Sequence, residues 1–367
     1  MRRASLFQMN MLMSTIGWVL MVTAGGSQQP SLTWLGVPGL SGSSDAYAVS
    51  ADGSVVVGQA NGRAFRWTAQ GGMQYLGDWG GGRSIAYGVS ADGSVVVGGA
   101  SYPTGLWRAF RWTATQGMQD IGRQIDYYSW ARGVSADGNM VAIAALYISS
   151  TGELPHPFWW TPSDGMQILM NPQGVGVGAA YGVSVDGHVV VGWALNTAWR
   201  TRAFRWVYPG RGGQNLGTLL DGGKDMDGGV GQAYGASGDG SVVIGGAYNA
   251  ALRESAFRWT EDGGMQELGT LPGYNSSVAY GVSADGLVVV GEAHNCVRGA
   301  SGSRAFRWTA SGGMEDLNIT YASLLTNGSV LLAARAISPN GRYIVGYGYN
   351  AATGRYEAFL LDVGTSR

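Results

Sequence analysis

Apolar positions along the chain occur in short runs that recur at a regular interval. In one copy, Ala86 to Gly98 reads Ala-Tyr-Gly-Val-Ser-Ala-Asp-Gly-Ser-Val-Val-Val-Gly, and two further runs, Arg-Ala-Phe-Arg-Trp-Thr and Gly-Met-Gln-Asp-Ile-Gly, follow it. Seven copies are present, and their Asp-Gly or Asn-Gly pairs lie 40 to 55 residues apart. A period of this length is typical of repeat folds in which each copy forms one supersecondary unit.

Each copy predicts four short β-strands. The Asp92-Gly93 pair lies between two apolar runs, which predicts a hairpin with a type I′ turn that needs positive φ at both positions. The three valines after the turn predict a strand buried on both faces. The repeated Phe is expected to fill an equivalent core position in each copy, and the polar run from Met118 to Gly122 should form the outermost strand.

Four antiparallel strands in a sheet buried on both faces describe a β-propeller blade. The seventh copy ends at Asp362 without a fourth strand, whereas Leu32 to Gly36 matches the fourth strand of the other copies. This N-terminal strand would complete the last blade and remove the open edge that a solenoid would leave. The sequence therefore predicts an all-β fold, a seven-bladed β-propeller of four-stranded antiparallel blades over residues 31–363, with the ring closed by the N-terminal strand.

The two ends differ from the repeats. Residues 1–24 have a basic start at Arg2 and Arg3, an apolar stretch and small residues at Val22-Thr23-Ala24, which predicts a secretory signal peptide. A ragged N-terminal helix is the alternative. Residues 25–30 would form a short linker and residues 364–367 a tail. We expect an extracellular or periplasmic protein without a membrane anchor.

Composition narrows the choice of partners. The chain has 367 residues with a formal net charge of −1, which gives no electrostatic reason to expect nucleic acid or an anionic membrane as a partner. Cys296 is the single cysteine, so no intrachain disulfide can form. The 63 glycines are expected in turns and in tight inner strands.

The motifs Val-Ser-Ala-Asp-Gly, Val-Val-Val-Gly, Ala-Phe-Arg-Trp and Gly-Met-Gln resemble those of the HAF-repeat extracellular proteins of bacteria. The resemblance covers residues 31 to 363 and implies a secreted repeat protein, although the family has no established activity. The chain departs from the pattern that names the family, because only His156-Pro157-Phe158 keeps a His at this position. No role for that His is carried over.

Residues that occur in every repeat are interpreted as structural. A catalytic site needs one set of groups, whereas a Ser and an Asp or Asn recur in all seven turns. The repeat arginines are expected to lie along a neighbouring blade, bonded to backbone carbonyls or stacked on an aromatic ring; they are Arg66, Arg111, Arg205, Arg258 and Arg307. We therefore expect no catalytic residue among them.

No cofactor or metal motif is present. The three histidines fall in different repeats without ligand spacing. An insert places Asp221, Asp225 and Asp227 within seven residues. A calcium loop would need more oxygen ligands at tighter spacing, so a solvated polar loop is the favoured interpretation, and cation binding stays an alternative.

The connections between strands predict where function lies. The turns between strands one and two are uniform, whereas lengths vary between strands two and three and between successive blades. Both variable connections emerge on the same side of the disc, which therefore collects the non-repeat aromatic and charged residues typical of recognition surfaces. The candidate ligand-binding residues are Trp79, Trp107, Tyr128, Trp130, Trp193, Trp199, Arg200 and Arg298.

Three functions are compatible with this pattern. The favoured one is a secreted, non-catalytic propeller that binds a glycan or a protein through its variable face. A polysaccharide-active enzyme of the sialidase or lyase kind would need a convergent acid/base cluster in the central funnel; scattered candidates are Asp78, Asp126, Glu254 and Glu292. A structural component of an extracellular matrix or coat is the third.

Overall fold

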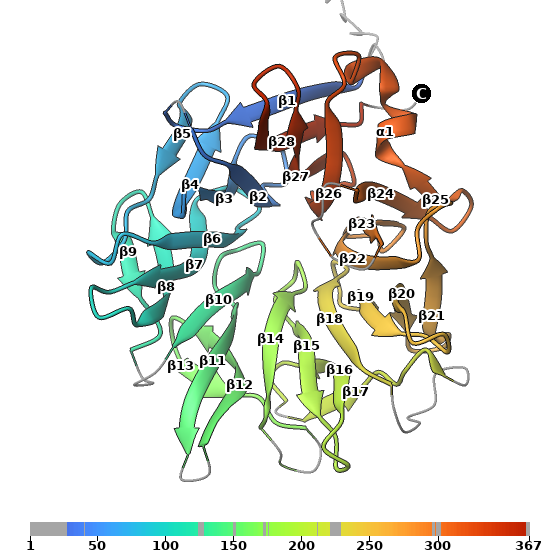
Figure 1. Cartoon of the computed structure of the whole chain (residues 1–367). Helices are drawn as coiled ribbons and strands as arrows, with labels where there is room; N and C mark the ends of the chain where they lie inside the picture. The colour runs from blue at the N-terminus through green and yellow to red at the C-terminus, as the bar shows by residue number, and fades with distance from the viewer. Residues whose placement is uncertain are drawn as a thin grey trace, which may run out of the picture.

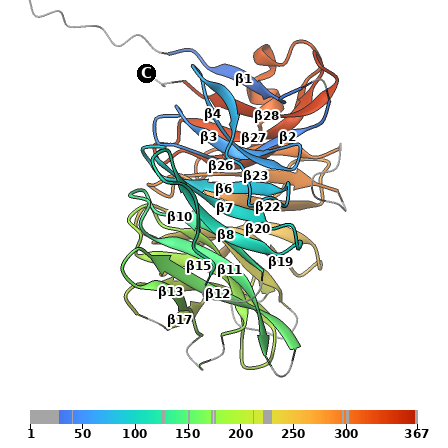
Figure 2. The same cartoon turned by 90° about the vertical axis from the view of Figure 1, so that its left-hand side faces the viewer.

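The computed structural model consists of seven four-stranded antiparallel sheets arranged around a central axis (Figure 1). Viewed from the side, the sheets form a thick disc (Figure 2). The structure describes residues 28–39, 41–123, 128–149, 152–171, 174, 176–210, 212–220, 229–295, 298 and 302–364. The predicted seven-bladed β-propeller is confirmed.

The blades follow one another along the chain, each running from its inner to its outer strand. Blades 1 to 3 are β2 (Ser44–Val49), β3 (Val56–Ala60), β4 (Arg63–Thr68) and β5 (Gly72–Tyr75); β6 (Ser84–Val89), β7 (Val95–Ser101), β8 (Trp107–Thr113) and β9 (Gly117–Asp120); and β10 (Ser129–Val134), β11 (Val141–Ser149), β12 (Gly152–Thr161) and β13 (Gly165–Ile168). Blades 4 and 5 are β14 (Gly178–Val183), β15 (Val189–Leu195), β16 (Thr201–Val207) and β17 (Gly213–Asn215); and β18 (Gly231–Ala236), β19 (Val242–Tyr248), β20 (Glu254–Thr260) and β21 (Gly264–Gly269). Blade 6 is β22 (Ser276–Val282), β23 (Val288–His294), β24 (Arg304–Thr309) and β25 (Gly313–Asp316). Two short helices, α1 (Leu317–Thr320) and η2 (Ala322–Leu324), connect it to blade 7.

Blade 7 joins the two ends of the chain. It comprises β26 (Val330–Ile337), β27 (Tyr343–Asn350) and β28 (Arg355–Asp362), and its outer strand is β1 (Ser31–Gly36). β1 pairs antiparallel with β28, and the Trp34 ring meets the Phe359 ring edge-on at 6.2 Å. In Figure 1 the blue β1 lies along the dark red β28. Closure by the N-terminal strand is confirmed.

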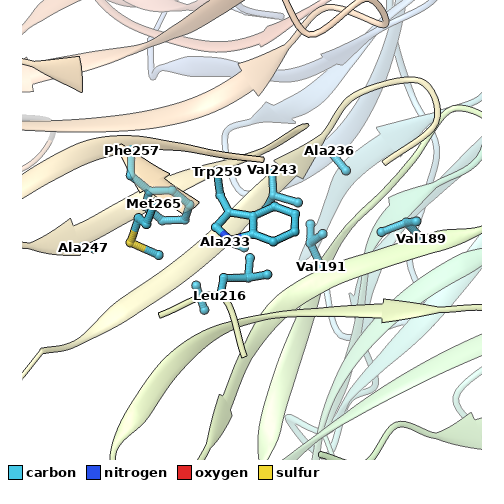
Figure 3. Packing of buried hydrophobic residues seen from close by; sticks show 11 residues of the cluster. Val189, Val191, Leu216, Ala233, Ala236, Val243, Ala247, Phe257, Trp259 and Met265 are labelled. Atoms are coloured by element: carbon cyan, nitrogen blue, oxygen red, sulfur yellow. The ribbon is translucent and has the colours of Figure 1, made fainter. Parts of the chain in front are cut away.

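The core lies between neighbouring blades, as the cluster shared by blades 4 and 5 shows (Figure 3). Six of the seven repeat Phe side chains are at most 1% exposed, as predicted. In blade 2, Phe110 faces Gly98 across the β7–β8 pair, where an added Cβ would lie 2.7 Å from the ring. Blade 3 has Ile143 at this position, opposite Phe158. Because Ile143 occupies the space that glycine leaves free in the other blades, Phe158 is only partly buried.

The turns between the first two strands differ from the predicted type I′ geometry. Among the described non-glycine residues, only Asn61, Trp199 and Leu252 have positive φ, so the turn aspartates do not. Only the glycine of each turn has a positive φ, which is +72° at Gly93. The N–H of Gly93 donates to the carbonyl of Ser90, three residues earlier. The loop is longer than expected because its serine and aspartate side chains bond to each other and to backbone N–H groups. A four-residue turn therefore needs only one left-handed position.

Backbone hydrogen bonds connect these turns around one side of the disc, which we name the turn face; the opposite side is the loop face. From each of the first six blades, an N–H in the turn donates to a carbonyl in the next turn. The successive bonds are Ala51 N to Ala91 O, Ala91 N to Ala136 O, Ala136 N to Val185 O, Asp186 N to Gly238 O, Gly238 N to Ala284 O, and Ala284 N to Pro339 O. This belt explains the uniform turns, because each one must match its neighbours.

Four of the five repeat arginines behave as predicted. Arg66, for example, donates to the carbonyl of Gly93 in the next blade at 3.4 Å, and Arg111, Arg205 and Arg258 make the equivalent bond. Arg307 differs, because it pairs with Glu315 of its own blade at 2.9 Å. It still lies beside the next blade, because it lines a pocket together with Asn340 and Gly341 of blade 7.

Several predicted features lie outside the described residues. These are the signal peptide, most of the linker, Asp126, Cys296, the Asp221–Asp227 insert and the last residues of the tail. Within the described parts of the chain, no helix is long and apolar enough to cross a membrane.

Candidate functional site

Every inner strand carries a β-bulge at the same position. In β2, for instance, Ala46 pairs with Gly58 and Ala48 with Val57, so that Tyr47 has no partner opposite it. Bulges re-aim side chains, and here the bulged residues line the central channel. The seven are Tyr47, Tyr87, Arg132, Tyr181, Tyr234, Tyr280 and Arg335. We call them the channel ring.

Neighbouring members of the channel ring touch one another. The Tyr47 and Tyr87 rings are 5.4 Å apart, and Tyr181 stacks on Tyr234 at 5.5 Å. The Arg132 guanidinium lies 4.1 Å from the Tyr87 ring centroid, and that of Arg335 lies 4.8 Å from the Tyr280 centroid. The ring borders a cavity of about 290 Å³.

The channel narrows on the turn-face side of this ring. The residue after each ring member is Gly in five blades and Ala in the other two. A Cβ added to Gly133 would lie 3.0 Å from the Cα of Gly182 in the next blade. Glycine is required here because the inner strands approach too closely for a larger residue. The cavity beneath the ring is smaller, about 180 Å³, with mostly Gly, Ala and Val in its wall.

On the loop-face side, the hydroxyls of three ring tyrosines each meet a different partner. Trp193 Nε1 donates to the Tyr181 hydroxyl at 3.0 Å, and the Tyr234 hydroxyl donates to Gln232 Oε1 at 2.7 Å. The Tyr280 hydroxyl lies 3.5 Å from Glu292 Oε2. The ring of tyrosines and arginines is thus covered by side chains that differ between blades, which we name the mouth layer.

Two carboxylates of the mouth layer converge on one arginine. Arg335 Nε lies 3.4 Å from Asp45 Oδ2, and its Nη1 lies 3.9 Å from Glu292 Oε2. Glu292 is fully buried. Burial raises the pKa of Asp45 to about 6, although Arg335 acts in the opposite direction. Burial lowers the pKa of Arg335, but the charges of Asp45, Tyr280 and Glu292 together outweigh this and raise it above its ordinary value.

A second arginine at the mouth is also paired with a carboxylate. Arg298 forms an ion pair with Glu254, and its Nη1 donates to the Tyr234 hydroxyl at 3.3 Å. Burial raises the pKa of Tyr234 to about 12. Arg298, a predicted binding residue, therefore lies against the channel ring rather than on an outlying loop.

Arg132 differs from both. Among the described residues, no hydrogen bond or ion pair reaches its side chain, whose Nε is buried. Its contacts are with two ring faces, those of Tyr87 at 4.1 Å and Tyr181 at 6.0 Å. Within the described part of the chain, the Arg132 guanidinium therefore faces the channel without an anion beside it.

Three predicted residues gather at the junction of blades 2 and 3. A Cβ added to Gly99 would lie 2.5 Å from Trp130 and 3.3 Å from Trp107, so both indoles cover this glycine. Tyr128 stacks on Trp130 at 6.1 Å. Beside them, the guanidinium of Arg83 lies 5.9 Å from the Trp107 ring.

The remaining candidates separate into three places. Trp193 belongs to the mouth layer through its bond to Tyr181. Trp79 stacks on Tyr102 at 5.1 Å and packs against the core of blades 1 and 2. Trp199 and Arg200 lie at the exposed tip of the β15–β16 hairpin, away from the channel ring, and Trp199 is 68% exposed.

The structural interpretation of the repeated serines and aspartates is confirmed. The Ser90 hydroxyl donates to Asp92 Oδ1 at 2.6 Å and accepts the N–H of Val95 at 2.9 Å. The same pair of bonds recurs in all seven turns. Asp78, a scattered candidate acid, accepts backbone N–H groups of its own loop.

Our sequence reasoning missed the channel ring. Its signal was present, because a position that holds Tyr in five repeats holds Arg132 and Arg335 in the other two. A buried core position does not exchange Tyr for Arg, so this exchange indicates a partly exposed site. Across the described residues, no group of three or more His, Cys, Asp or Glu side chains could hold a metal ion.

Comparison with known proteins shows the fold and no closer relationship. No protein-family model matches the chain, and no curated protein does. A structure from a study of two prolyl endopeptidases aligns with a TM-score of 0.54 and 11% identity, over 92% of this chain and 51% of that one. TolB from Acinetobacter baumannii aligns with a TM-score of 0.46 and 15% identity, over 76% of this chain and 64% of that one. The β-propeller domain of the Trilobed protease from Pyrococcus furiosus gives 0.47 and 12%, over 73% and 82%.

Proposed function

We propose that this protein is a non-catalytic binding propeller that takes its ligand at the mouth of the central channel, on the loop face. The observation that carries the proposal is the channel ring with its mouth layer. The ring supplies an aromatic face and a hydroxyl in five blades and a guanidinium in the other two, whereas the mouth layer differs from blade to blade. A constant scaffold under variable polar groups is the arrangement that a specific binding site requires.

The chemistry of the mouth favours a glycan over an apolar ligand. Indole and phenol rings offer flat faces, and Gln232, Glu292 and Asp45 supply polar groups between them. A second hollow of about 350 Å³, between blades 7 and 1, adjoins the first, and Tyr47 lines both. A chain of sugar residues could therefore occupy more than one position at the mouth.

We also propose that the protein acts outside the cytoplasm, as the N-terminal signal and the resemblance to HAF-repeat proteins suggest. The test is N-terminal sequencing of the protein recovered from periplasm and medium. A start near Gly25 supports export, and an intact Met1 on protein found outside the cell contradicts cleavage.

Binding is tested with the purified propeller on a glycan array and in pull-downs, followed by titration of the ligands found. Trp193→Ala combined with Trp130→Ala should weaken binding tenfold or more, because Trp193 belongs to the mouth layer and Trp130 lies two residues before Arg132 on the inner strand β10. Gln70→Ala combined with Gln116→Ala, in turns on the turn face, is the control and should leave affinity unchanged. The site assignment fails if the control variant is the damaging one.

A polysaccharide-active enzyme is the second candidate, and one observation favours it. Asp45 and Glu292 converge on Arg335, and the raised pKa of Asp45 is a property that a general acid needs. Wild-type protein would then release reducing ends or unsaturated products from a polysaccharide that it binds. Asp45→Asn and Glu292→Gln would each abolish this release while binding persists; release that survives in both variants excludes these residues as the catalytic pair.

A further inference from the structure

We propose that the channel ring recognises an acidic sugar, a uronic acid residue, and that Arg132 binds its carboxylate. This rests on the proposed function, because it names the ligand class of the same site. The argument starts from the three arginines that face the channel and its mouth.

Two of these cations are already neutralised. Arg335 has Asp45 and Glu292 beside it, and Arg298 is paired with Glu254. Arg132 has neither a carboxylate nor a carbonyl among the described residues, and its Nε is buried without a partner. Leaving a buried polar group unsatisfied destabilises the fold. A fold that keeps Arg132 where five blades have Tyr therefore offers this cation to a ligand.

The form of the guanidinium indicates which anion it would bind. Its planar fork matches a carboxylate, which can accept two parallel N–H bonds. Tyr87 and Tyr181 lie against it on either side and hold its position. The anion would thus meet Arg132 at the level of the channel ring and in the aromatic part of the cavity.

The opposite part of the ring suits hydroxyl groups. Asp45 and Glu292 lie in blades 1 and 6 and share Arg335, so the two carboxylates outnumber their cation. Their oxygens can accept hydrogen bonds from sugar hydroxyls, and the Tyr hydroxyls can both donate and accept. One ligand with a carboxylate at one end and several hydroxyls along its body satisfies both sides.

The size of the site indicates one sugar residue rather than a chain threaded through the disc. The cavity at the ring, about 290 Å³, lies at the small end of the usual range for ligand pockets. Beneath it, the inner strands close in at Gly133 and Gly182. A terminal uronic acid would therefore enter from the loop face, with any further residues lying across the mouth.

The test is calorimetric titration of the whole purified propeller. The probes are galacturonic and glucuronic acid, their di- and trisaccharides, and the neutral sugars galactose and glucose. Galacturonic acid methyl ester serves as a probe that keeps the shape and lacks the charge. Comparing monosaccharides with oligosaccharides distinguishes a free sugar acid from a polysaccharide end.

The variant Arg132→Tyr is suited to this test, because Tyr occupies the equivalent position in five blades and so fits the ring. Arg111→Gln, which removes the charge of an arginine that lies between blades 2 and 3 on the third strand of its blade, is the matched control. We expect wild-type protein and the control to bind a uronic acid at least tenfold more tightly than the methyl ester. Arg132→Tyr should bind both alike.

The proposal is overturned if the acidic and neutral probes bind equally to wild-type protein, or if Arg132→Tyr keeps the preference. It is also overturned if no probe binds while a peptide with a free C-terminal carboxylate does so through Arg132. In each of these cases the proposed function stands, provided that the bound ligand still depends on Trp130 and Trp193. Loss of that dependence contradicts the proposed function itself.

Discussion

The side-chain amide of Asn340 donates a hydrogen bond to the carbonyl of Ala51, 3.1 Å away and 289 residues earlier in the chain. This bond completes the belt of hydrogen bonds on the turn face. Pro339 occupies the position whose N–H is the donor in five other blades, and proline has no N–H. Asn340 supplies the missing donor from its side chain, which the aspartates of the other turns could not do.

Asn340→Asp should therefore destabilise the propeller. Its Oδ1 can still accept from Ser338 and from the N–H of Arg342, as Asn340 does now. The donor to Ala51 is lost, and a carboxylate faces a carbonyl oxygen, so we expect a loss of about 1 kcal/mol in the free energy of unfolding. Urea denaturation measures it. The reciprocal change Asp92→Asn should be neutral within about 0.5 kcal/mol; equal effects of the two substitutions would contradict this role.

Removal of β1 should destabilise the whole disc. The strand covers β28, and without it Phe359 loses its contact with Trp34 while an edge with unpaired N–H and C=O groups is left open. A protein that starts at residue 37 should melt well below one that starts at residue 28. Differential scanning calorimetry compares the two truncations, and indistinguishable melting temperatures would disprove closure by this strand.

Substitutions at two turn glycines can distinguish the cost of a left-handed backbone from the cost of a steric clash. Gly93 and Gly341 have φ of +72° and +74°, but a Cβ at Gly93 would lie 2.5 Å from Val55, whereas at Gly341 the nearest atom is 3.7 Å away. Gly341→Ala should cost only the roughly 1 to 2 kcal/mol of the left-handed conformation. Gly93→Ala should cost at least about 1 kcal/mol more, because it also overpacks the interface between blades. Chemical denaturation of both variants tests the difference.

Asp45 predicts a pH dependence of stability with a definite sign. Burial raises its pKa to about 6 in the folded state, above the value of about 4 expected when unfolded. Between these values the folded state binds more protons, so the free energy of unfolding should rise as the pH falls from 7 toward 4, by about 1 to 3 kcal/mol. Asp45→Asn should remove this rise, as denaturation at several pH values would show. Hydrogen bonds from Ser90 and Ser94 lower the pKa of the turn carboxylate Asp92. Its contribution to the free energy of unfolding is therefore lost only at pH values below this range.

The β19–β20 hairpin contains strain that a single substitution should relieve. Leu252 has φ of +55° and is 74% exposed, so its conformation is unfavourable without compensating burial. Leu252→Gly should raise the free energy of unfolding by roughly 0.5 to 1 kcal/mol. Ala251→Gly, at a neighbour without positive φ, should lower it. The β15–β16 hairpin of the neighbouring blade has Trp199 in the same conformation, with φ of +56°.

The repeat pattern was sufficient to predict the architecture. Seven copies of four strand signals predict seven blades, and the missing fourth strand of the last copy identifies β1 as its replacement. The structural role of the turn serines followed from their presence in every copy. These features are local or repeated, so the period of hydrophobic residues already contains them. The predicted turn type was wrong. An Asp-Gly pair usually indicates a two-residue hairpin loop, but here the side-chain hydrogen bonds of Ser90 and Asp92 stabilise a longer loop.

Only the tertiary structure revealed the channel ring on which the proposed binding site rests. An inner strand is buried on both faces, so the alternation of apolar and polar residues does not show which side chain faces the central axis. The β-bulge that directs Tyr47 into the channel also has no signal in the pattern of apolar residues. Ring closure then brings together residues from blades 1, 6 and 7, so that Asp45 and Glu292 share Arg335, while Arg132 remains among tyrosines. The sequence by itself determined the number of blades, the strand order and the closing strand, because each follows from the strand signals of a repeat and from how often they recur. The charge balance of the channel was decided by the fold, because it depends on which side chains the closed ring places next to one another.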